Sequence, residues 1–394
     1  MSILRGILAI AVVLLIAWLI SFNKKTVRWK NALVLFLIMF VLAFLSLKTD
    51  TGIKVLNSVS NFFSWLLEQA QGGIDFVFGG IQTDGFVFFF NVLMPIVFIS
   101  ALIGILQYTK ILPVVAKGIG WLINKITGMG EVESFAGLMT SMLGQPNSLI
   151  TIEGLIPKLS RQQTFTIALF GLTSVSASTL GSYMEIVDGK FVLVAVLLNL
   201  FGTFAISAFM NPYDPKKQDL KLKIETESDD GGNFFSVLSD YISSGFGMAV
   251  GIGATLIGFM ALITFLNNSF DIIFGLSFTE ILGYVFSPLA WLMGIPSSDI
   301  VEAGSVMATK LLGNEFVALD TLTSTAANLA PKSIAMLSTY AISFSNMGTW
   351  GMIYAGFKSM GKEQGKYIAK DTLRLIAGSV LVSMLSAGIV GIFY

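Results

Sequence analysis

The sequence predicts an all-α polytopic membrane protein with eight transmembrane helices and two opposed re-entrant helical hairpins in an inverted repeat. Of its 394 residues, 54% are hydrophobic and only 12% are charged, whereas soluble domains carry about 25% charged residues. Apolar runs long enough to cross a hydrocarbon core recur along the chain, and they lack the alternating polarity of barrel strands. The predicted spans are 5–22, 31–47, 87–107, 164–183, 191–210, 245–266, 334–356 and 375–393.

The chain contains no cysteine and no histidine. This composition excludes disulfides, metal or haem ligation through these residues, and Ser-His or Cys-His nucleophiles. The formal net charge of +0 gives no electrostatic reason to expect a nucleic-acid partner. The first apolar run lacks a small-residue cleavage site, so we interpret it as a retained span rather than a removed signal.

Residues 1–107 are predicted to form an N-terminal scaffold. Between the spans, we expect interfacial or partly buried helices near 52–82, 110–127 and 270–295. The segment 211–233 mixes Lys, Glu and Asp, which indicates a cytoplasmic linker between two halves. With alternating spans, 18 of the 24 Lys and Arg residues fall on one side of the membrane. The positive-inside rule makes that side cytoplasmic and places both termini outside.

One stretch of the sequence occurs twice, 169 residues apart. The thirteen residues from Glu133 match those from Glu302 at four positions, and each copy ends in an amide side chain. The first copy lies between basic, cytoplasmic flanks and the second between outward-facing ends. We therefore predict hairpins at 131–157 and 296–331 that enter the membrane from opposite sides, each followed by a span with a polar break. The hairpin tips should meet these broken helices near the midplane. The two predicted repeats are 108–210 and 234–394.

Glu315 is the sharpest single candidate for a binding role. An ionisable residue at membrane depth is expensive and by default a functional-site hypothesis. Its carboxylate can accept paired hydrogen bonds from vicinal hydroxyls, such as those of a sugar. The alternative is a structural partner for Lys310, although five residues apart is poor helical spacing.

Amide side chains mark the tip of the first hairpin. Gln145 and Asn147 flank Pro146, and an amide offers the donor and acceptor pair that suits a planar nucleobase edge. The alternative is that Gly-Gln-Pro-Asn is only turn chemistry.

Hydroxyl side chains are dense in the polar break of the fourth span. Ser174, Ser176, Ser178 and Thr179 can simply bond back to the preceding turn or join neighbouring helices. Their density, and their match to the break in the seventh span, favour substrate or ion binding by one or two of them. Asn346 lies in that second break among apolar residues, where an unpaired amide is costly.

At 308–318 the chain resembles the concentrative nucleoside transporter family, bacterial NupC type, through the run Ala-Thr-Lys-Leu-Leu-Gly-Asn-Glu-Phe-Val-Ala. The resemblance runs almost from end to end. It implies a homotrimer with one site per protomer, in a bacterial cell membrane, with transport driven by a sodium or proton gradient and no cofactor. Supporting stretches are 91–106, 197–202, 281–286 and 385–391.

The resemblance also implies roles for individual residues. Glu315 and Asn346 would hold the ribose, Thr349 would share that role through its hydroxyl, and Phe344 would pack near the base. Gln145 would contact the base. The family usually has a hydroxyl residue and then Glu after this glutamine, whereas here Pro146 and Asn147 stand there, so the base preference is open.

The same resemblance implies a cation site. Sodium-coupled relatives place an Asn side chain where this chain has Thr140. Ser174 matches a serine ligand, and the carbonyls of Leu143 and Val175 would complete the pocket. Hydroxyl and carbonyl oxygens suit a hard cation, but the missing amide, together with the titratable Glu315, favours proton coupling.

Together these observations predict a cation-coupled nucleoside importer that works by alternating access. The nearest alternative is a transporter of the same fold that carries a modified nucleoside or a nucleobase. A membrane enzyme would need converging acid, base or metal groups, for which this composition offers few candidates. A passive channel would show a continuous polar stripe instead of two opposed hairpins.

Overall fold

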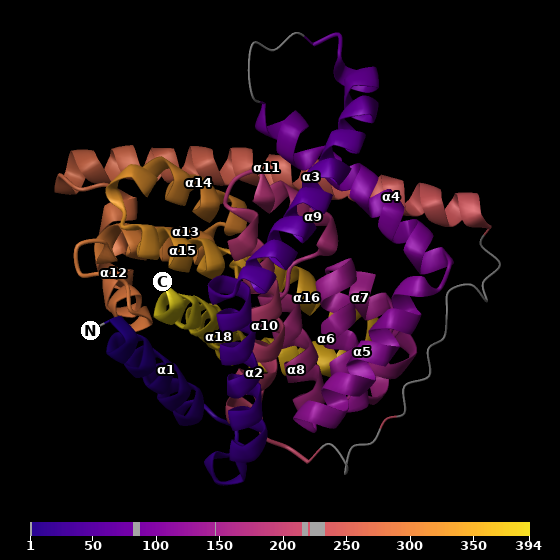
Figure 1. The fold of residues 1–394 in the computed structure, drawn as a ribbon, viewed down its shortest axis with the longest axis horizontal. Coiled ribbons are helices and arrows are strands. Elements are labelled where there is room, and N and C mark those ends of the chain that lie inside the picture. Colours follow the sequence, from indigo (N-terminus) through magenta and orange to yellow (C-terminus); the bar gives the residue numbers. More distant parts are fainter. Residues whose placement is uncertain (1, 82–86, 146, 215–219, 221–232) are drawn as a thin grey trace.

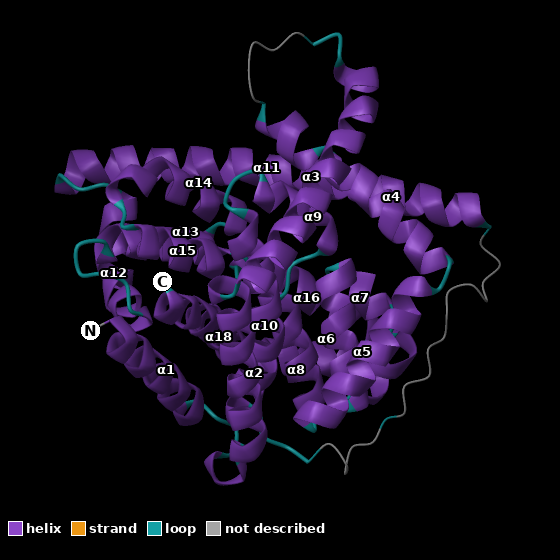
Figure 2. Cartoon of the chain, in the orientation of Figure 1, coloured by secondary structure: helices purple, strands orange, loops and turns teal. Residues whose placement is uncertain are grey.

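The computed structural model describes residues 2–81, 87–145, 147–214, 220 and 233–394. Every regular element in these ranges is helical (Figure 2), which confirms the predicted all-α fold. The elements are α1 (Ser2–Leu19), η1 (Lys24–Thr26), α2 (Trp29–Lys48), α3 (Asp50–Phe78), η2 (Phe89–Leu93), α4 (Pro95–Tyr108), α5 (Ile111–Thr127), α6 (Glu131–Leu143), α7 (Asn147–Ile150), η3 (Glu153–Lys158), α8 (Arg161–Thr173), α9 (Ala177–Met184), α10 (Gly189–Met210), α11 (Phe234–Phe274), α12 (Phe278–Met293), α13 (Ile300–Leu312), α14 (Glu315–Thr325), η6 (Ala326–Asn328), α15 (Pro331–Ala341), α16 (Met347–Met360), α17 (Lys362–Lys370) and α18 (Thr372–Phe393).

The C-terminal helix α18 lies at the centre of the molecule. It packs against α1, α8, α10 and α15 (Figure 1). Apart from Arg374 near its start, its residues are apolar or small on all sides, as expected for a helix enclosed by others. Gly391 shows why small residues are needed here: a Cβ at this position would lie 2.6 Å from the sulfur of Met336. Such close approach between helices is typical of membrane proteins.

In the part of the chain that the structure describes, six helical segments are long and apolar enough to cross a membrane. They coincide with six of the eight predicted spans. The first predicted span is the shorter apolar helix α1, and the seventh, 334–356, is divided between α15 and α16. The number of spans and their orientation in a membrane stay predictions. Most of the expected linker at 211–233 lies outside the described residues.

The two copies of the repeated stretch fold into matching helices. α6 and α13 each contain thirteen residues, and both their starts and their ends are 169 residues apart. α10 and α18, which follow the two polar breaks, each contain 22 residues. The predicted breaks in 164–183 and 334–356 fall between α8 and α9 and between α15 and α16. The division into a scaffold and two repeats stays a prediction.

The longest helix, α11, has 41 residues and runs along one edge of the molecule (Figure 1). It packs on α4 and also contacts α12 and α14. Only Gly245 and Ala249 of α11 are buried, so most of its apolar surface is exposed. α11 therefore borders the rest of the chain along one face only.

Candidate functional site

The first polar break ends one helix and starts another. α8 ends at Thr173 because the backbone becomes extended at Ser174, with φ −89° and ψ 168°. Ser176 then caps α9 by accepting a hydrogen bond from the backbone N–H of Ser178, which satisfies a donor that the new helix leaves free. Gly144, at the tip of the first hairpin, lies against this break: a Cβ there would be 2.7 Å from the Cβ of Ser176.

The second break has the same construction. α15 ends at Ala341, and Asn346 caps α16 by accepting a hydrogen bond of 2.8 Å from the backbone N–H of Thr349. Between them, the backbone N–H of Phe344 donates to the carbonyl of Ser174 over 3.2 Å. The two broken helices are therefore joined at their interrupted segments by a main-chain hydrogen bond.

A cavity of about 450 Å³ opens between these breaks, the two hairpin tips and α11. All seven predicted substrate residues line it, although they come from four separate parts of the sequence. They are Gln145, Asn147, Thr179, Glu315, Phe344, Asn346 and Thr349. The roles of these residues remain proposals, but the structure brings them together.

Glu315 is buried and held by two donors. It is the first residue of α14, whose N-cap Asn314 accepts a hydrogen bond of 3.0 Å from the backbone N–H of Val317. One carboxylate oxygen accepts from the hydroxyl of Tyr183 at 3.1 Å and the other from the amide Nδ2 of Asn346 at 3.2 Å. A carboxylate at a helix N-terminus is favoured by the helix dipole, and its remaining lone pairs can accept from a ligand.

The side-chain amide of Gln145, unlike the carboxylate of Glu315, has no hydrogen-bond partner among the described residues. The residue is 6% exposed, and both the nitrogen and the oxygen of the amide are buried. Its side chain lies against α8, where a Cβ at Gly171 would be 2.9 Å from the amide nitrogen. A buried amide without partners is costly, and Gln145 lines the cavity, so a ligand that reaches this amide would satisfy its donor and its acceptor.

The other predicted residues differ in how they are engaged. The Thr179 hydroxyl donates to the carbonyl of Ser176 at 2.9 Å. This bond to the preceding turn is the alternative to ligand binding that the sequence analysis describes. Asn147 begins α7, and Thr349 lies in the first turn of α16, where its backbone N–H is already used by the cap. Pro146, between the two amides of the first tip, lies outside the described residues.

Two components of the site were not found from the sequence. Tyr183 is fully buried, with its ring 4.8 Å from that of Phe316 and its hydroxyl on Glu315. Its position one helical turn after Thr179 was the available signal. The second component is α11, which forms one wall of the cavity with residues that include Ser244 and Thr255. A span that is apolar overall gave no reason to select them.

The predicted cation residues lie where the first hairpin meets the first break. The Thr140 hydroxyl donates to the Ala136 carbonyl at 2.7 Å and lies within hydrogen-bond distance, 3.2 Å, of the Ser148 hydroxyl. Ser174 accepts a hydrogen bond of 3.2 Å from the hydroxyl of Ser141. Leu143 and Val175 are buried beside them. Within the described ranges, no group of three or more acidic residues could hold a metal, so a cation here would depend on neutral oxygens.

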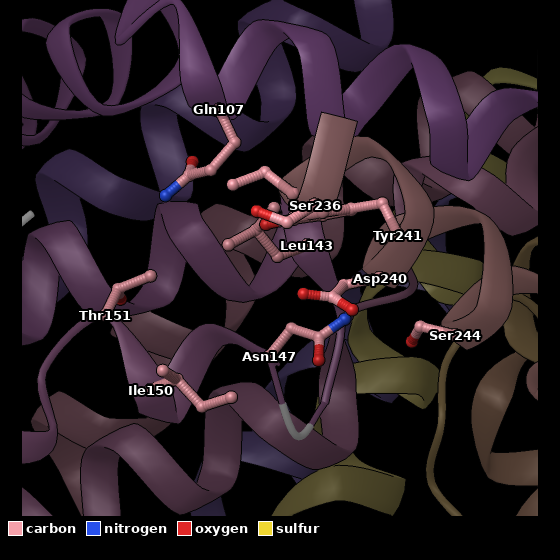
Figure 3. Close-up of a pocket in the computed structure, with 10 residues that line it drawn as sticks. Gln107, Leu143, Asn147, Ile150, Thr151, Ser236, Asp240, Tyr241 and Ser244 are labelled. Atoms are coloured by element: carbon pink, nitrogen blue, oxygen red, sulfur yellow. The ribbon is translucent and has the colours of Figure 1, made fainter. Parts of the chain in front are cut away.

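A second cavity of about 350 Å³ adjoins the first. Asn147 and Ser244 line both cavities. Figure 3 shows the side chains of Asn147 and Asp240 pointing toward one another across this space, with Gln107 on its far side. The site is thus continued by a polar space between the first hairpin and the start of α11.

Comparisons with known proteins agree with this geometry. Three family models together match most of the chain: the N-terminus of Na+ dependent nucleoside transporters at 8–81, a nucleoside recognition model at 89–190, and the C-terminus of Na+ dependent nucleoside transporters at 191–391. The purine nucleoside transport protein NupG of Bacillus subtilis is 32% identical, with 100% of both chains covered. Human solute carrier family 28 member 3 is 27% identical over 96% of this chain and 58% of its own length.

The fold is also that of solved structures. CNTnw in an inward-facing substrate-bound state has a TM-score of 0.92 at 27% identity, covering 100% of this chain and 98% of that one. A CNTnw variant in an outward-facing state gives the same TM-score. These matches confirm the predicted transporter, as opposed to an enzyme. The chain belongs to the family of sodium-dependent, concentrative nucleoside transporters.

Proposed function

We propose that the chain is a cation-coupled importer that binds one nucleoside in the 450 Å³ cavity. The observation that carries this proposal is the pairing, in one cavity, of a buried carboxylate held by two donors with a buried amide that has no partner among the described residues. A nucleoside presents groups complementary to both, since its ribose has vicinal hydroxyls and its base has a planar edge of donors and acceptors.

The ribose is assigned to the second hairpin and second break. The carboxylate of Glu315 accepts from the sugar hydroxyls, and Asn346, held by its own bond to that carboxylate, orients the acceptor and offers a further polar contact. The hydroxyl of Thr349 lines the same side of the cavity. Charge-assisted hydrogen bonds of this kind are about twice as strong as neutral ones, so this end of the cavity supplies most of the affinity.

The base is assigned to the first hairpin. Gln145 can donate and accept in the plane of the base edge, and Asn147 adds a second amide at the cavity wall. Phe344, also in the lining, supplies an aromatic surface for the base. A modified nucleoside or a free nucleobase is the second candidate substrate, because these amides are not matched to one base. A purine is the first substrate to test, since NupG transports purine nucleosides.

Transport is proposed to follow alternating access. The hairpins and broken helices are joined to each other by hydrogen bonds between nitrogen and oxygen atoms, whereas α11 accepts a weaker hydrogen bond, from the Ser178 hydroxyl to the sulfur of Met248 at 3.9 Å. Two glycines of α11, Gly247 and Gly251, line the cavity, and a Cβ on either would meet no atom within 4 Å. Because these two glycines have no side chains that project into the cavity, the hairpins and broken helices can move past α11 with the substrate between them.

The coupling ion is proposed to bind in the first repeat, at Thr140, Ser174 and the carbonyls of Leu143 and Val175. The family description favours sodium, whereas the loss of an amide ligand at Thr140 favours a proton. The protein is proposed to function in the bacterial cell membrane as a homotrimer. The long exposed apolar surface of α11 supports burial against lipid or a second copy, because such a surface is costly in water.

Uptake into proteoliposomes tests the proposal. Radiolabelled adenosine and uridine are supplied under an imposed sodium gradient or an imposed proton gradient, with wild type compared with Glu315→Gln. Accumulation driven by one gradient and lost in the variant is the expected result, and it identifies the ion. A folded wild type that accumulates neither nucleoside under either gradient refutes the assignment. Uptake that persists without any gradient indicates a channel.

A further inference from the structure

One of the differences between the two repeats is the presence of a charged residue in the second copy. Ser141, near the end of α6, corresponds to Lys310 in α13 at the common spacing of 169 residues. Lys310 is fully buried, with 0% of the residue exposed. A buried ammonium is costly unless its donors are satisfied, so the second repeat must provide a site for a positive charge.

That site consists of neutral oxygen atoms. The ammonium Nζ of Lys310 donates to the hydroxyl of Ser343 at 2.6 Å, to the hydroxyl of Ser383 at 3.0 Å and to the main-chain carbonyl of Tyr340. It also lies 4.2 Å from the centre of the Tyr340 ring. Hydroxyl and carbonyl oxygens are the ligands that hard cations take. The ammonium is therefore bound as a free cation would be.

Lys310 attracts the opposite charge of Glu315 but is not in direct contact with it. Within the described part of the chain, the ion pairs that lie within 4 Å do not include Lys310. Both oxygens of Glu315 instead accept from Tyr183 and Asn346. The hydrogen bonds of Lys310 hold the end of α15 and the middle of α18 together.

The first repeat shares one part of this arrangement, without the attached charge. Ser343 corresponds to Ser174, again 169 residues apart, and Ser174 accepts a hydrogen bond of 3.2 Å from Ser141. Both serines follow the C-terminal end of a half-helix, α8 or α15. The free carbonyls at such an end favour a positive charge. In the second repeat, Lys310 supplies this positive charge. In the first repeat, the equivalent residue is Ser141, which carries no charge.

We propose that Lys310 is a built-in cation, whose ammonium binds Ser343 at the second break as a free, exchangeable cation binds Ser174 at the first. This inference rests on the proposed function in one respect: the exchangeable cation is the coupling ion. Each protomer then has one exchangeable cation site of this type instead of two. The lysine fixes the second break permanently, while the first break is completed only when the ion binds.

Lys310→Ser tests the second repeat, because it creates there the residue that the first repeat has. Thermal unfolding of the full-length protein in detergent is measured in ammonium, sodium and choline chloride at equal ionic strength. Lys310→Met, which fills the same space without binding ions, is the matched control. The expected result is a Tm of the serine variant several degrees higher in ammonium or sodium than in choline, with no such difference in the methionine variant. The proposal is refuted if the Tm of the two variants changes equally between the salts. It is also refuted if the serine variant folds in none of the salts while the methionine variant folds.

Ser141→Lys tests the first repeat from the opposite direction. A tethered ammonium there is expected to make nucleoside binding independent of the coupling ion, so that the Kd changes less than twofold when the ion is removed. A variant that keeps the wild-type ion dependence refutes the proposal. Failure of the proposed function is separate, since it leaves the wild type without gradient-driven uptake. Failure of this inference leaves wild-type uptake intact and the serine variant without a response to cations.

Discussion

Replacing Gln145 by Leu is expected to separate ligand affinity from stability. The substitution keeps the size of the side chain but removes two buried polar atoms that lack partners among the described residues. An unsatisfied buried polar group costs about 1–3 kcal/mol. The unliganded variant is therefore expected to unfold at the same Tm as wild type or higher. If the amide binds the base, the lost hydrogen bonds cost about 1–3 kcal/mol of binding, a rise in Kd of about 5- to 150-fold.

Isothermal titration of purified protein with adenosine, combined with thermal unfolding of the unliganded protein, measures both effects. Gln107→Leu is the matched control. The amide oxygen of Gln107 is also buried without a partner among the described residues, but Gln107 lines only the neighbouring cavity. The control is expected to keep the wild-type Kd. A Gln145 variant that binds adenosine as tightly as wild type, or a control that loses the same affinity, would refute the assignment of the base to the first hairpin.

Three further results are expected. Gly251→Ala should retain uptake, whereas Gly251→Phe should lower it at least tenfold without lowering Tm, because the added ring would enter the cavity; equal uptake by both would show that substrate does not pass α11. Although burial acts to raise it, hydrogen bonds from Ser298, Ser333 and the Ala330 backbone lower the pKa of Asp299 below its ordinary value. The ionised Asp299 therefore stabilises the fold above a pH of about 4, and this stabilisation is lost as the pH falls through its lower folded pKa. Asp299→Asn should for this reason show a smaller decline of Tm in acid than wild type. Equal declines of Tm in the two proteins would contradict this. Arg161→Ala should lower the free energy of unfolding by about 1.5–3 kcal/mol, since it removes two charge-assisted hydrogen bonds to the buried carboxylate of Asp371, to which Arg374, at 3.7 Å, is a more distant partner; a variant with the Tm of wild type would contradict that role.

Local chemistry was sufficient to predict the helices and the position of their breaks. Apolar runs determined the spans, and capping residues such as Asn346 ended or started helices where the sequence had suggested. The internal repeat indicated where the hairpin tips lie, and Gln145 and Glu315 were selected there because of the chemistry of an amide and of a carboxylate at membrane depth. Proline, amide and hydroxyl residues within apolar sequence carry this information because few other residues interrupt a membrane helix.

Contacts between distant parts of the chain could not be predicted in the same way. Tyr183 and Glu315 are 132 residues apart, and only the fold makes one the donor of the other. The use of α11 as a cavity wall depends on which of its faces points inward, and its nearly uniform apolar sequence does not specify that. Lys310 was considered only as a partner of Glu315, because the hydroxyls that hold it lie in other parts of the chain.

The hydrogen bond from the Phe344 backbone N–H to the Ser174 carbonyl has a consequence for how this site can change over time. It is made by main-chain atoms, so every residue except proline at 344, and any residue at 174, can preserve it. Substitutions of these side chains can therefore alter what the cavity accepts while the two halves of the molecule stay connected. A transporter built on such a joint can acquire a new substrate by single replacements, without first losing the structure that carries the old one.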